Sequence, residues 1–326
     1  MAASPPLRWG IVATGGIATT VVADLQADPD AQVVAVVSRS SRRARGFARE
    51  HGIPRAYDDV DALLADGEVD VVYVATPHPH HAAPTRAALE AGVAVLCEKP
   101  LTADLDEAQA LIDLARERGV FLAEAMWMRC HPLVRHARQL VIDGAIGEVR
   151  VVDAELGFPA PPDPTSRLWA PELGGGALWD VGVYAVAFSR TFLPGAPQLV
   201  GTVGSLATTG VDAEATLLLG TPDGTQVRAS CSLVAPLPST ATVVGTRGSI
   251  TFDGPLYAPP RIRVARLGED VEEHEEPRVG NGYGHQLAEV HACLRAGRTE
   301  SELLPLDETL DVLQLLTAAR EALGAT

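Results

Sequence analysis

The sequence predicts an α/β protein in two parts, a doubly wound parallel sheet followed by a larger, mostly antiparallel sheet. As far as about residue 124, apolar runs rich in Val and Ile alternate with helical segments of roughly 10–15 residues. A glycine-containing turn joins the first run to the first helix. After residue 124, strand-like runs follow one another with few helices between them, which is typical of antiparallel sheets. We expect domains at residues 1–125 and 126–326.

In the first part, each apolar run is followed by a segment with helical spacing. The predicted strands are residues 9–13, 33–37, 69–75, 94–97 and 120–123, and the predicted helices are residues 17–27, 41–51, 61–64, 81–91 and 104–118. Right-handed crossovers between parallel strands would make this a doubly wound sheet. Ligands of such sheets bind at the carboxyl ends of the strands.

The second part reads as an α+β domain whose open sheet has one face covered by helices and the other available for a partner. A proline-rich loop at 159–171 interrupts it. The predicted strands are residues 147–158, 198–206, 213–219, 226–233, 240–245, 249–252 and 261–266, with helices at 132–143, 284–296 and 307–323.

Composition limits the possible partners. The net charge of -16 argues against nucleic acid and anionic membranes. No apolar stretch approaches the ~20 residues of a membrane helix, and no signal peptide is recognisable. The four cysteines are scattered without metal or redox spacing. We expect a cytoplasmic protein.

The turn after the first strand, Ala13-Thr14-Gly15-Gly16-Ile17-Ala18, is similar to the G-x-G-x-x-G/A dinucleotide fingerprint, with alanine at the first glycine. Gly15 would let the backbone approach a pyrophosphate, and the following helix supplies N–H groups. Glycine turns between strand and helix also have purely structural uses. The position in the first strand–helix unit favours a dinucleotide site that includes Thr14, Gly16 and Ile17.

The end of the second strand indicates which dinucleotide binds. NAD-binding proteins carry an acid there for the ribose hydroxyl, whereas a 2′-phosphate favours arginine. This chain has Ser38, Arg39 and Arg43 and no acid between residues 38 and 43. NADP(H) is therefore preferred and NAD(H) remains possible. The alternative is that residues 38–43 only form the solvated start of a helix and bind no nucleotide.

Residues 76–81, Thr-Pro-His-Pro-His-His, follow the next strand. Three nearby histidines suggest a metal, but no acid or cysteine accompanies them and two prolines stiffen the turn. We predict no metal. Thr76, Pro77 and His81 are expected to lie over the cofactor.

Lys99 is the only lysine among 26 Lys and Arg residues. The pKa of a lysine ammonium group can be shifted by its surroundings, and the group can relay a proton, whereas an arginine side chain stays charged. Glu98-Lys99-Pro100 ends the fourth strand, so Lys99 should point beyond its carboxyl end. The alternative is that Lys99 is a surface lysine without a functional role.

Three glycines, Gly174 to Gly176, precede a helix on which Asp180 and Tyr184 lie four residues apart and so share a face. The glycines would allow the chain to pass close to a ligand. Buried carboxylate and phenol groups need polar partners. A structural Tyr–Asp contact without chemistry is the alternative.

Taken in order, these motifs resemble the glucose–fructose oxidoreductase / inositol dehydrogenase / rhizopine-catabolism (Gfo/Idh/MocA) family over essentially the whole chain. Tyr184, where many members have histidine, and the segment 124–129 (Glu-Ala-Met-Trp-Met-Arg) are similar to its NADP-dependent dihydrodiol dehydrogenase and D-xylose 1-dehydrogenase branch. The sequence departs from the family pattern at two places. Ala13 replaces the first glycine of the fingerprint, and Cys130-His131 stands where this branch often has aromatic residues. The resemblance also suggests a cis peptide bond before Pro100.

The resemblance implies hydride transfer between nicotinamide and a C–OH group of an aldose, such as D-xylose or D-glucose, or of a cyclic vicinal diol. It implies Lys99 and Tyr184 as the catalytic pair. Either Tyr184 is the base, assisted by the nearby ammonium, or Lys99 carries the proton. Asp180 would orient a hydroxyl or Lys99. The other expected substrate contacts are Trp127, Arg129, Phe158 and Arg167, and the other expected cofactor contacts are Glu98 and Trp169.

Homodimers or homotetramers formed through the second sheet are also implied. Two other functions stay open. One is an aldose–aldose oxidoreductase that holds its cofactor permanently. The other is a non-catalytic NADP(H)-sensing regulator on the same fold.

Overall fold

The computed structural model describes residues 5–326, and the chain divides into two compact units. The first unit comprises the chain up to Thr102, then Asp106–Ala125 and Val279–Leu306. The second comprises Ala103–Leu105, Met126–Arg278 and Asp307–Thr326. The sequence-based division at residue 125 differs from this one in two respects, because Ala103–Leu105 belong to the second unit and residues 279–306 return to the first. Nothing in their composition distinguishes that segment from the chain around it.

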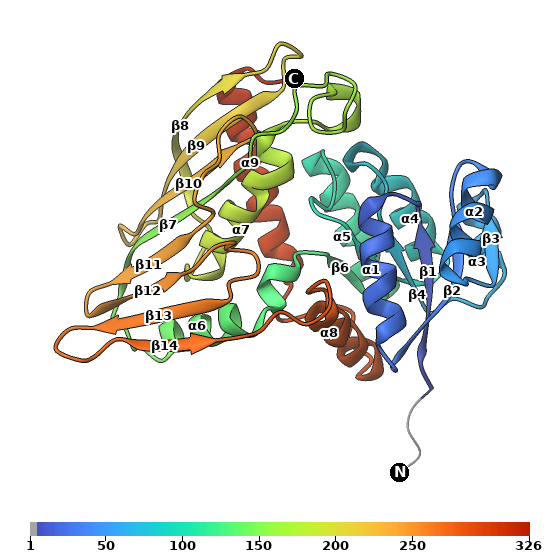
Figure 1. Cartoon of the computed structure of the whole chain (residues 1–326), viewed down its shortest axis with the longest axis horizontal. Helices are drawn as coiled ribbons and strands as arrows, with labels where there is room; N and C mark the ends of the chain where they lie inside the picture. Colours follow the sequence, from blue (N-terminus) through green and yellow to red (C-terminus); the bar gives the residue numbers. More distant parts are fainter. Residues whose placement is uncertain (1–4) are drawn as a thin grey trace. The chain divides into compact units, whose positions relative to one another are not determined.

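The first unit contains a six-stranded sheet of order β3-β2-β1-β4-β5-β6, in which all strands are parallel (Figure 1). Its strands are β1 (Leu7–Val12), β2 (Ala31–Val37), β3 (Arg55–Tyr57), β4 (Val71–Val74), β5 (Ala94–Cys97) and β6 (Leu122–Glu124). The doubly wound parallel sheet is thereby confirmed. The strand β3 was not predicted, since three half-buried residues carry no apolar run.

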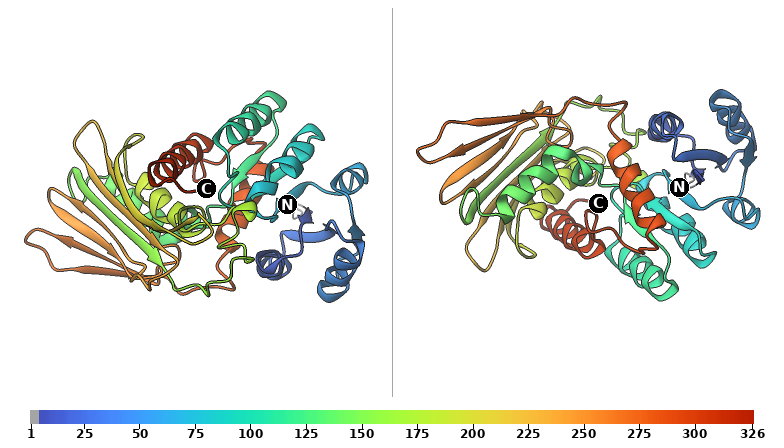
Figure 2. Two further views of the ribbon diagram at one scale, coloured as in Figure 1. Left: turned by 90° about the horizontal axis from the view of Figure 1, so that it is seen from above. Right: turned by 90° about the horizontal axis from the view of Figure 1, so that it is seen from below.

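Helices cover both faces of this sheet (Figure 2). They are α1 (Gly16–Ala27), α2 (Ser41–His51), α3 (Val60–Ala65), α4 (Ala82–Glu90), α5 (Leu105–Arg118) and α8 (Gly284–Arg295). Because both faces are covered, the central strands are buried throughout and read as continuous apolar runs, as in Val71–Val74.

The second unit contains an eight-stranded sheet of order β14-β13-β12-β11-β7-β10-β9-β8. Only the β7–β10 pair is parallel, so the mostly antiparallel open sheet is confirmed. Its strands are β7 (Val149–Gly157), β8 (Gln198–Leu206), β9 (Asp212–Gly220), β10 (Gln226–Ser232), β11 (Ala241–Gly245), β12 (Gly248–Phe252), β13 (Arg261–Arg266) and β14 (Glu272–Glu275).

Three helices, α6 (Pro132–Ile142), α7 (Val183–Thr191) and α9 (Leu306–Leu323), lie on one face of this sheet (Figure 1). Side chains alternate accordingly: Val152, Ala154 and Leu156 of β7 are buried, whereas Asp153 and Glu155 between them are partly exposed. Within residues 5–326 no helix covers the other face. No helix of this described part is both long and apolar enough to span a membrane.

The helix that carries Asp180 and Tyr184 begins with an unpredicted π-helical turn. This turn, η4 (Leu178–Gly182), continues directly into α7. π-Helical turns are rare and occur mostly at functional sites. Its buried sequence gives no pattern that would distinguish it from an ordinary helix start.

Candidate active site

In the first unit, the turn between β1 and α1 leaves room for a ligand. Gly15 precedes α1 without a side-chain cap, so the helix begins with unsatisfied N–H groups. A Cβ added at Gly15 or Gly16 would meet no protein atom within 4 Å. These glycines are therefore not needed for packing within the protein. Ala13 has a φ of 103°, a conformation that favours glycine, at the place where the fingerprint has its first glycine.

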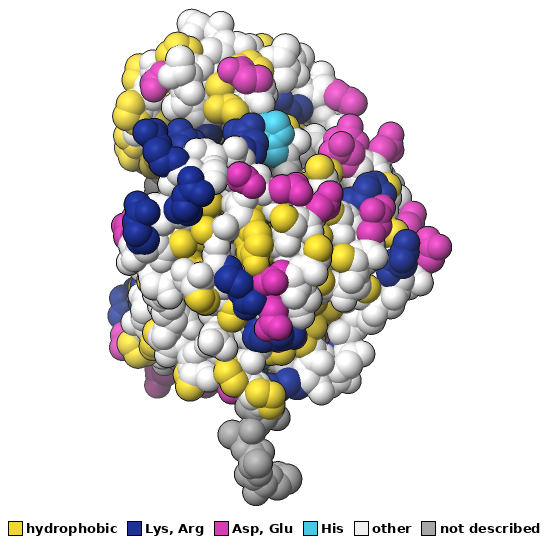
Figure 3. All heavy atoms as spheres, turned by 90° about the vertical axis from the view of Figure 1, so that its right-hand side faces the viewer, with side chains coloured by type: hydrophobic (Ala, Val, Ile, Leu, Met, Phe, Trp, Pro, Cys, Tyr) yellow, Lys and Arg dark blue, Asp and Glu magenta, His cyan; other side chains and the backbone are white. Residues whose placement is uncertain are grey.

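The end of β2 carries the predicted phosphate-binding residues. Ser40 caps α2 by accepting the Arg43 backbone N–H at 3.4 Å. Arg39 and Arg43 are exposed, and across residues 5–326 neither forms an ion pair with a carboxylate. Figure 3 shows Lys and Arg side chains gathered on part of the face of the molecule that it draws. Two guanidinium groups without carboxylate partners suit a phosphate.

His81, expected over the cofactor, is fully buried. Its Nδ1 lies 2.9 Å from the Pro100 carbonyl oxygen and its Nε2 lies 2.7 Å from that of Thr76. Burial lowers the pKa of His81, although the carbonyl contacts oppose this. Both ring nitrogens are thus engaged by backbone, and His81 links the loop after β4 to the loop after β5. Any effect of His81 on a cofactor would pass through these loops.

The loop after β5 carries Lys99, which is half-buried, and the bond before Pro100 is cis, as suggested. Glu98, also buried, accepts the Tyr73 hydroxyl at 2.5 Å and the Lys99 backbone N–H at 3.2 Å. The carboxylate therefore fixes the backbone from which the Lys99 side chain extends.

In the second unit, the helix beginning at η4 presents both predicted polar groups. Asp180 Oδ1 accepts a hydrogen bond from Arg167 Nη1 at 2.6 Å. Tyr184 Oη accepts the Trp127 indole N–H at 2.9 Å. An indole N–H can only donate, so the Tyr184 oxygen is the acceptor in this pair. Two hydrogen-bonded pairs result, Arg167 with Asp180 and Trp127 with Tyr184, and the helix supplies one member of each.

Tyr257, in the loop between β12 and β13, was not predicted as a site residue. Its ring centroid lies 5.4 Å from that of Trp127 and 5.3 Å from that of Tyr184. Together the three residues form an aromatic cluster. The adjacent prolines mark a loop but give no indication that it returns to Tyr184.

Three further residues that were predicted to contact the substrate or the cofactor are Arg129, Trp169 and Phe158. Arg129 is buried in an ion pair with Glu308 of α9 and also donates to the Ala187 carbonyl. Contact between Arg129 and a substrate would require this ion pair to open. Trp169 is buried and its indole donates to the Pro161 carbonyl at 2.7 Å, whereas Phe158 is 41% exposed.

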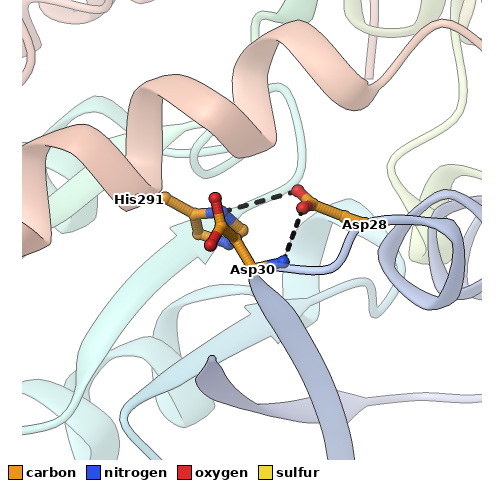
Figure 4. Close-up of side chains that lie close together, drawn as sticks. All are labelled: Asp28, Asp30 and His291. Atoms are coloured by element: carbon orange, nitrogen blue, oxygen red, sulfur yellow. Dashed lines mark hydrogen bonds and ion pairs between the residues drawn. The ribbon is translucent and has the colours of Figure 1, made fainter. Parts of the chain in front are cut away.

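One cluster of metal-ligating residue types lies in the first unit, formed by Asp28, Asp30 and His291 (Figure 4). The Trp9 indole donates to His291 Nε2 at 3.1 Å, so Nδ1 carries the proton and faces Asp28 at 3.5 Å. Asp30 pairs with Arg295 at 2.7 Å. These partners satisfy the cluster, and we assign it a structural role at the amino end of β2.

The parallel sheet with its open glycine turn, followed by a second sheet whose helix carries a carboxylate and a phenol, defines a two-domain nucleotide-dependent oxidoreductase. Residues 7–126 match the family model described as "Oxidoreductase family, NAD-binding Rossmann fold", and residues 134–251 match "GFO/IDH/MocA C-terminal domain". The chain belongs to the Gfo/Idh/MocA family. It is an enzyme whose first unit is an NAD-binding Rossmann domain.

Its relatives include trans-1,2-dihydrobenzene-1,2-diol dehydrogenase of Mus musculus, 38% identical over 98% of each chain. The enzyme of the same name from Oryctolagus cuniculus is 39% identical over 97% of this chain and 98% of its own. The fold is similar to that of a 3-ketoreductase from Actinomadura kijaniata in complex with NADP and TDP-benzene. That structure has a TM-score of 0.86 and 28% identity, covering 97% and 98% of the two chains. An aldose-aldose oxidoreductase from Caulobacter crescentus gives a TM-score of 0.87 at 26% identity, covering 98% and 97%.

Proposed function

We propose that this enzyme uses NADP(H) to transfer a hydride to or from a C–OH carbon of an aldose or a cyclic vicinal diol. The observation that carries the proposal is the Tyr184 oxygen, which accepts the Trp127 indole N–H within an aromatic cluster. A phenol held as an acceptor beside flat apolar rings suits the removal of a proton from a ring hydroxyl. The diol and aldose substrates named for the relatives support the same substrate class.

Lys99 and Tyr184 are the proposed catalytic pair, as the family resemblance implies. NADP, when bound, supplies the acceptor for the hydride. Tyr184 takes the hydroxyl proton, and the ammonium of Lys99 stabilises the phenolate that does so. Asp180, oriented by Arg167, binds a second substrate hydroxyl. Glu98 holds the Lys99 backbone in place.

The preference for NADP is supported by the exposed Arg39 and Arg43 and by the absence of an acid at residues 38–43. We expect Arg39→Ala to weaken NADP binding roughly tenfold, because a guanidinium–phosphate contact is lost. NAD binding should hardly change. Isothermal titration with both nucleotides checks this, and equal losses for the two would contradict the assignment.

The function is tested by following NADPH absorbance with NADP and a panel of aldoses and cyclic diols. Wild type, Lys99→Met and Tyr184→Phe are compared, with Tyr57→Phe as a control at a half-buried tyrosine outside the proposed site. We expect both site variants to lose at least about 100-fold in kcat while binding NADPH normally. The control should retain its activity.

Other outcomes identify the alternatives. NADPH released only when the purified protein is denatured, with turnover of paired sugars and no added nucleotide, would indicate an aldose–aldose oxidoreductase. The similarity to the enzyme from Caulobacter crescentus favours testing this. Tight NADPH binding without turnover of any panel member would leave a nucleotide sensor.

We also propose that the uncovered face of the second sheet joins copies of this chain. It is supported by exposed apolar side chains on β8 and β9, namely Val200 (75%), Val203 (68%) and Leu218 (51%). Apolar groups on an uncovered sheet face commonly mark an interface. Sedimentation analysis of wild type and of Val203→Glu/Leu218→Glu tests this. A wild-type monomer would contradict it.

A further inference from the structure

A buried ion pair lies beneath the start of the helix that carries Asp180 and Tyr184. Asp212, the first residue of β9, is 0% exposed, and its Oδ2 accepts the Leu178 backbone N–H at 2.5 Å. Leu178 begins η4, so the Asp212 carboxylate caps the helix start. A carboxylate at this end also interacts favourably with the helix dipole.

Arg320 of α9 completes the arrangement. Its Nη1 pairs with Asp212 Oδ1 at 2.5 Å and lies 3.4 Å from the Gly175 carbonyl oxygen. The guanidinium carbon lies 5.3 Å from the ring centroid of Trp179. Arg320 also donates to the carbonyl of Thr326. One side chain therefore contacts the glycine turn, the first turn of the helix and the end of the chain.

Gly176 shows how closely the backbone is fitted to this pair. Its φ is +124°, and an added Cβ would overlap Asp212 Oδ1 and lie 2.8 Å from Arg320 Nη1. The glycine at this position therefore permits close approach to a carboxylate of the protein itself. Burial raises the pKa of Asp212, against the opposing effect of Arg320 and the backbone N–H groups. A carboxylate buried at this place therefore needs the guanidinium of Arg320 and the backbone N–H groups to stabilise its charged form.

We propose that Asp212 and Arg320 form a clamp that holds the start of the catalytic helix, and that both are positioning residues for Asp180 and Tyr184. The clamp rests on the structure alone, whereas its effect on turnover rests on the proposed function. A helix start shifted by about 1 Å can cost 10²-fold in rate, because hydride and proton transfer need aligned groups.

The test uses Asp212→Asn, which keeps the shape and removes the charge, together with Asp212→Asn/Arg320→Gln. The single variant leaves the charge of Arg320 buried without its partner carboxylate, which can prevent folding. The double variant removes both charges and replaces the single variant in that case. The matched control is Asp70→Asn. Asp70 likewise pairs with an arginine, Arg8 at 2.7 Å, and accepts a backbone N–H at 2.8 Å, but it lies at the amino end of β4.

We expect amide hydrogen exchange over residues 176–184 to become at least about tenfold faster in the clamp variants and to stay unchanged in Asp70→Asn. We expect kcat to fall roughly 10- to 100-fold in the clamp variants with KM for NADP unchanged. Thermal unfolding gives the stability loss of each variant, and kcat is measured well below each melting temperature.

Unchanged exchange over residues 176–184 would overturn the clamp. Faster exchange with kcat equal to that of Asp70→Asn would overturn the positioning role. A wild type that turns over no panel substrate would refute the proposed function instead, and the exchange measurement would still decide whether the clamp exists.

Discussion

The two glycine-rich turns of this chain look alike in sequence and differ in what surrounds them. The first, Ala13 to Ala18, has open space beside Gly15 and Gly16. The second, Gly174 to Gly176, is packed: a Cβ at Gly175 would lie 2.9 Å from the Leu168 carbonyl oxygen, and one at Gly176 would overlap Asp212. The first turn therefore has room for an external group, whereas the second already accommodates the protein's own groups.

This difference separates two uses of glycine that a motif cannot distinguish. At the first turn we expect glycine to keep space free for the proposed nucleotide, so its replacement should affect binding. At the second turn glycine allows one part of the protein to approach another, so its replacement should affect folding. The following predictions test this distinction, from the largest expected effect to the smallest.

Gly176→Ala should destabilise the protein by about 2–5 kcal/mol, because it adds a strained φ and a clash with a buried ion pair. Urea unfolding measures the change. Gly195→Ala is the control in the same unit, since a Cβ there meets no atom within 4 Å. Equal stability of the two variants would show that the second turn has space that the structure does not show.

Gly15→Ala should leave the free energy of unfolding within about 0.5 kcal/mol of wild type, since Gly15 has an ordinary φ of -82° and open space. NADPH binding should weaken about 10- to 100-fold, because a methyl group would keep the pyrophosphate from the backbone. Gly46→Ala in α2 is the control. Unaltered binding would remove the first turn from the nucleotide site.

Acid should destabilise the first unit through its buried histidines. Burial lowers the pKa of His81 and of His291 in the folded protein, so the unfolded chain binds more protons as the pH falls through about 6.5. Stability is therefore retained above this pH and lost below it, with a slope of up to about 1.4 kcal/mol per pH unit for each group. Urea unfolding at pH 7.5 to 5.5 measures the slope. His291→Gln should reduce it, and an unchanged slope would exclude His291 as a source.

Ala13→Gly should stabilise the protein by about 0.5–1 kcal/mol. The φ of 103° strains alanine, and relief of this strain exceeds the extra entropy that glycine loses on folding. Thermal unfolding should show an increase of a few degrees at most. A lower melting temperature would mean that the alanine methyl makes a compensating contact.

The sequence alone determined both sheets and most of their strands and helices, because apolar periodicity reports directly which faces are buried. It also identified the residues of the open first turn and of the loop around Lys99, since glycine, proline and a solitary lysine restrict what a short segment can do. The strands β3 and β14 were missed, because a half-buried and a largely exposed edge strand have little apolar pattern.

Only the tertiary structure decided how single polar groups are used. Arg129 and Arg167 look equivalent in sequence, yet Arg129 is held by Glu308 and Arg167 holds Asp180. Tyr257 joins Tyr184, and Asp212 joins Arg320 across 108 residues of chain. A polar side chain takes whichever partner the fold brings within about 3 Å. That distance depends on the packing of distant segments, which no local pattern encodes.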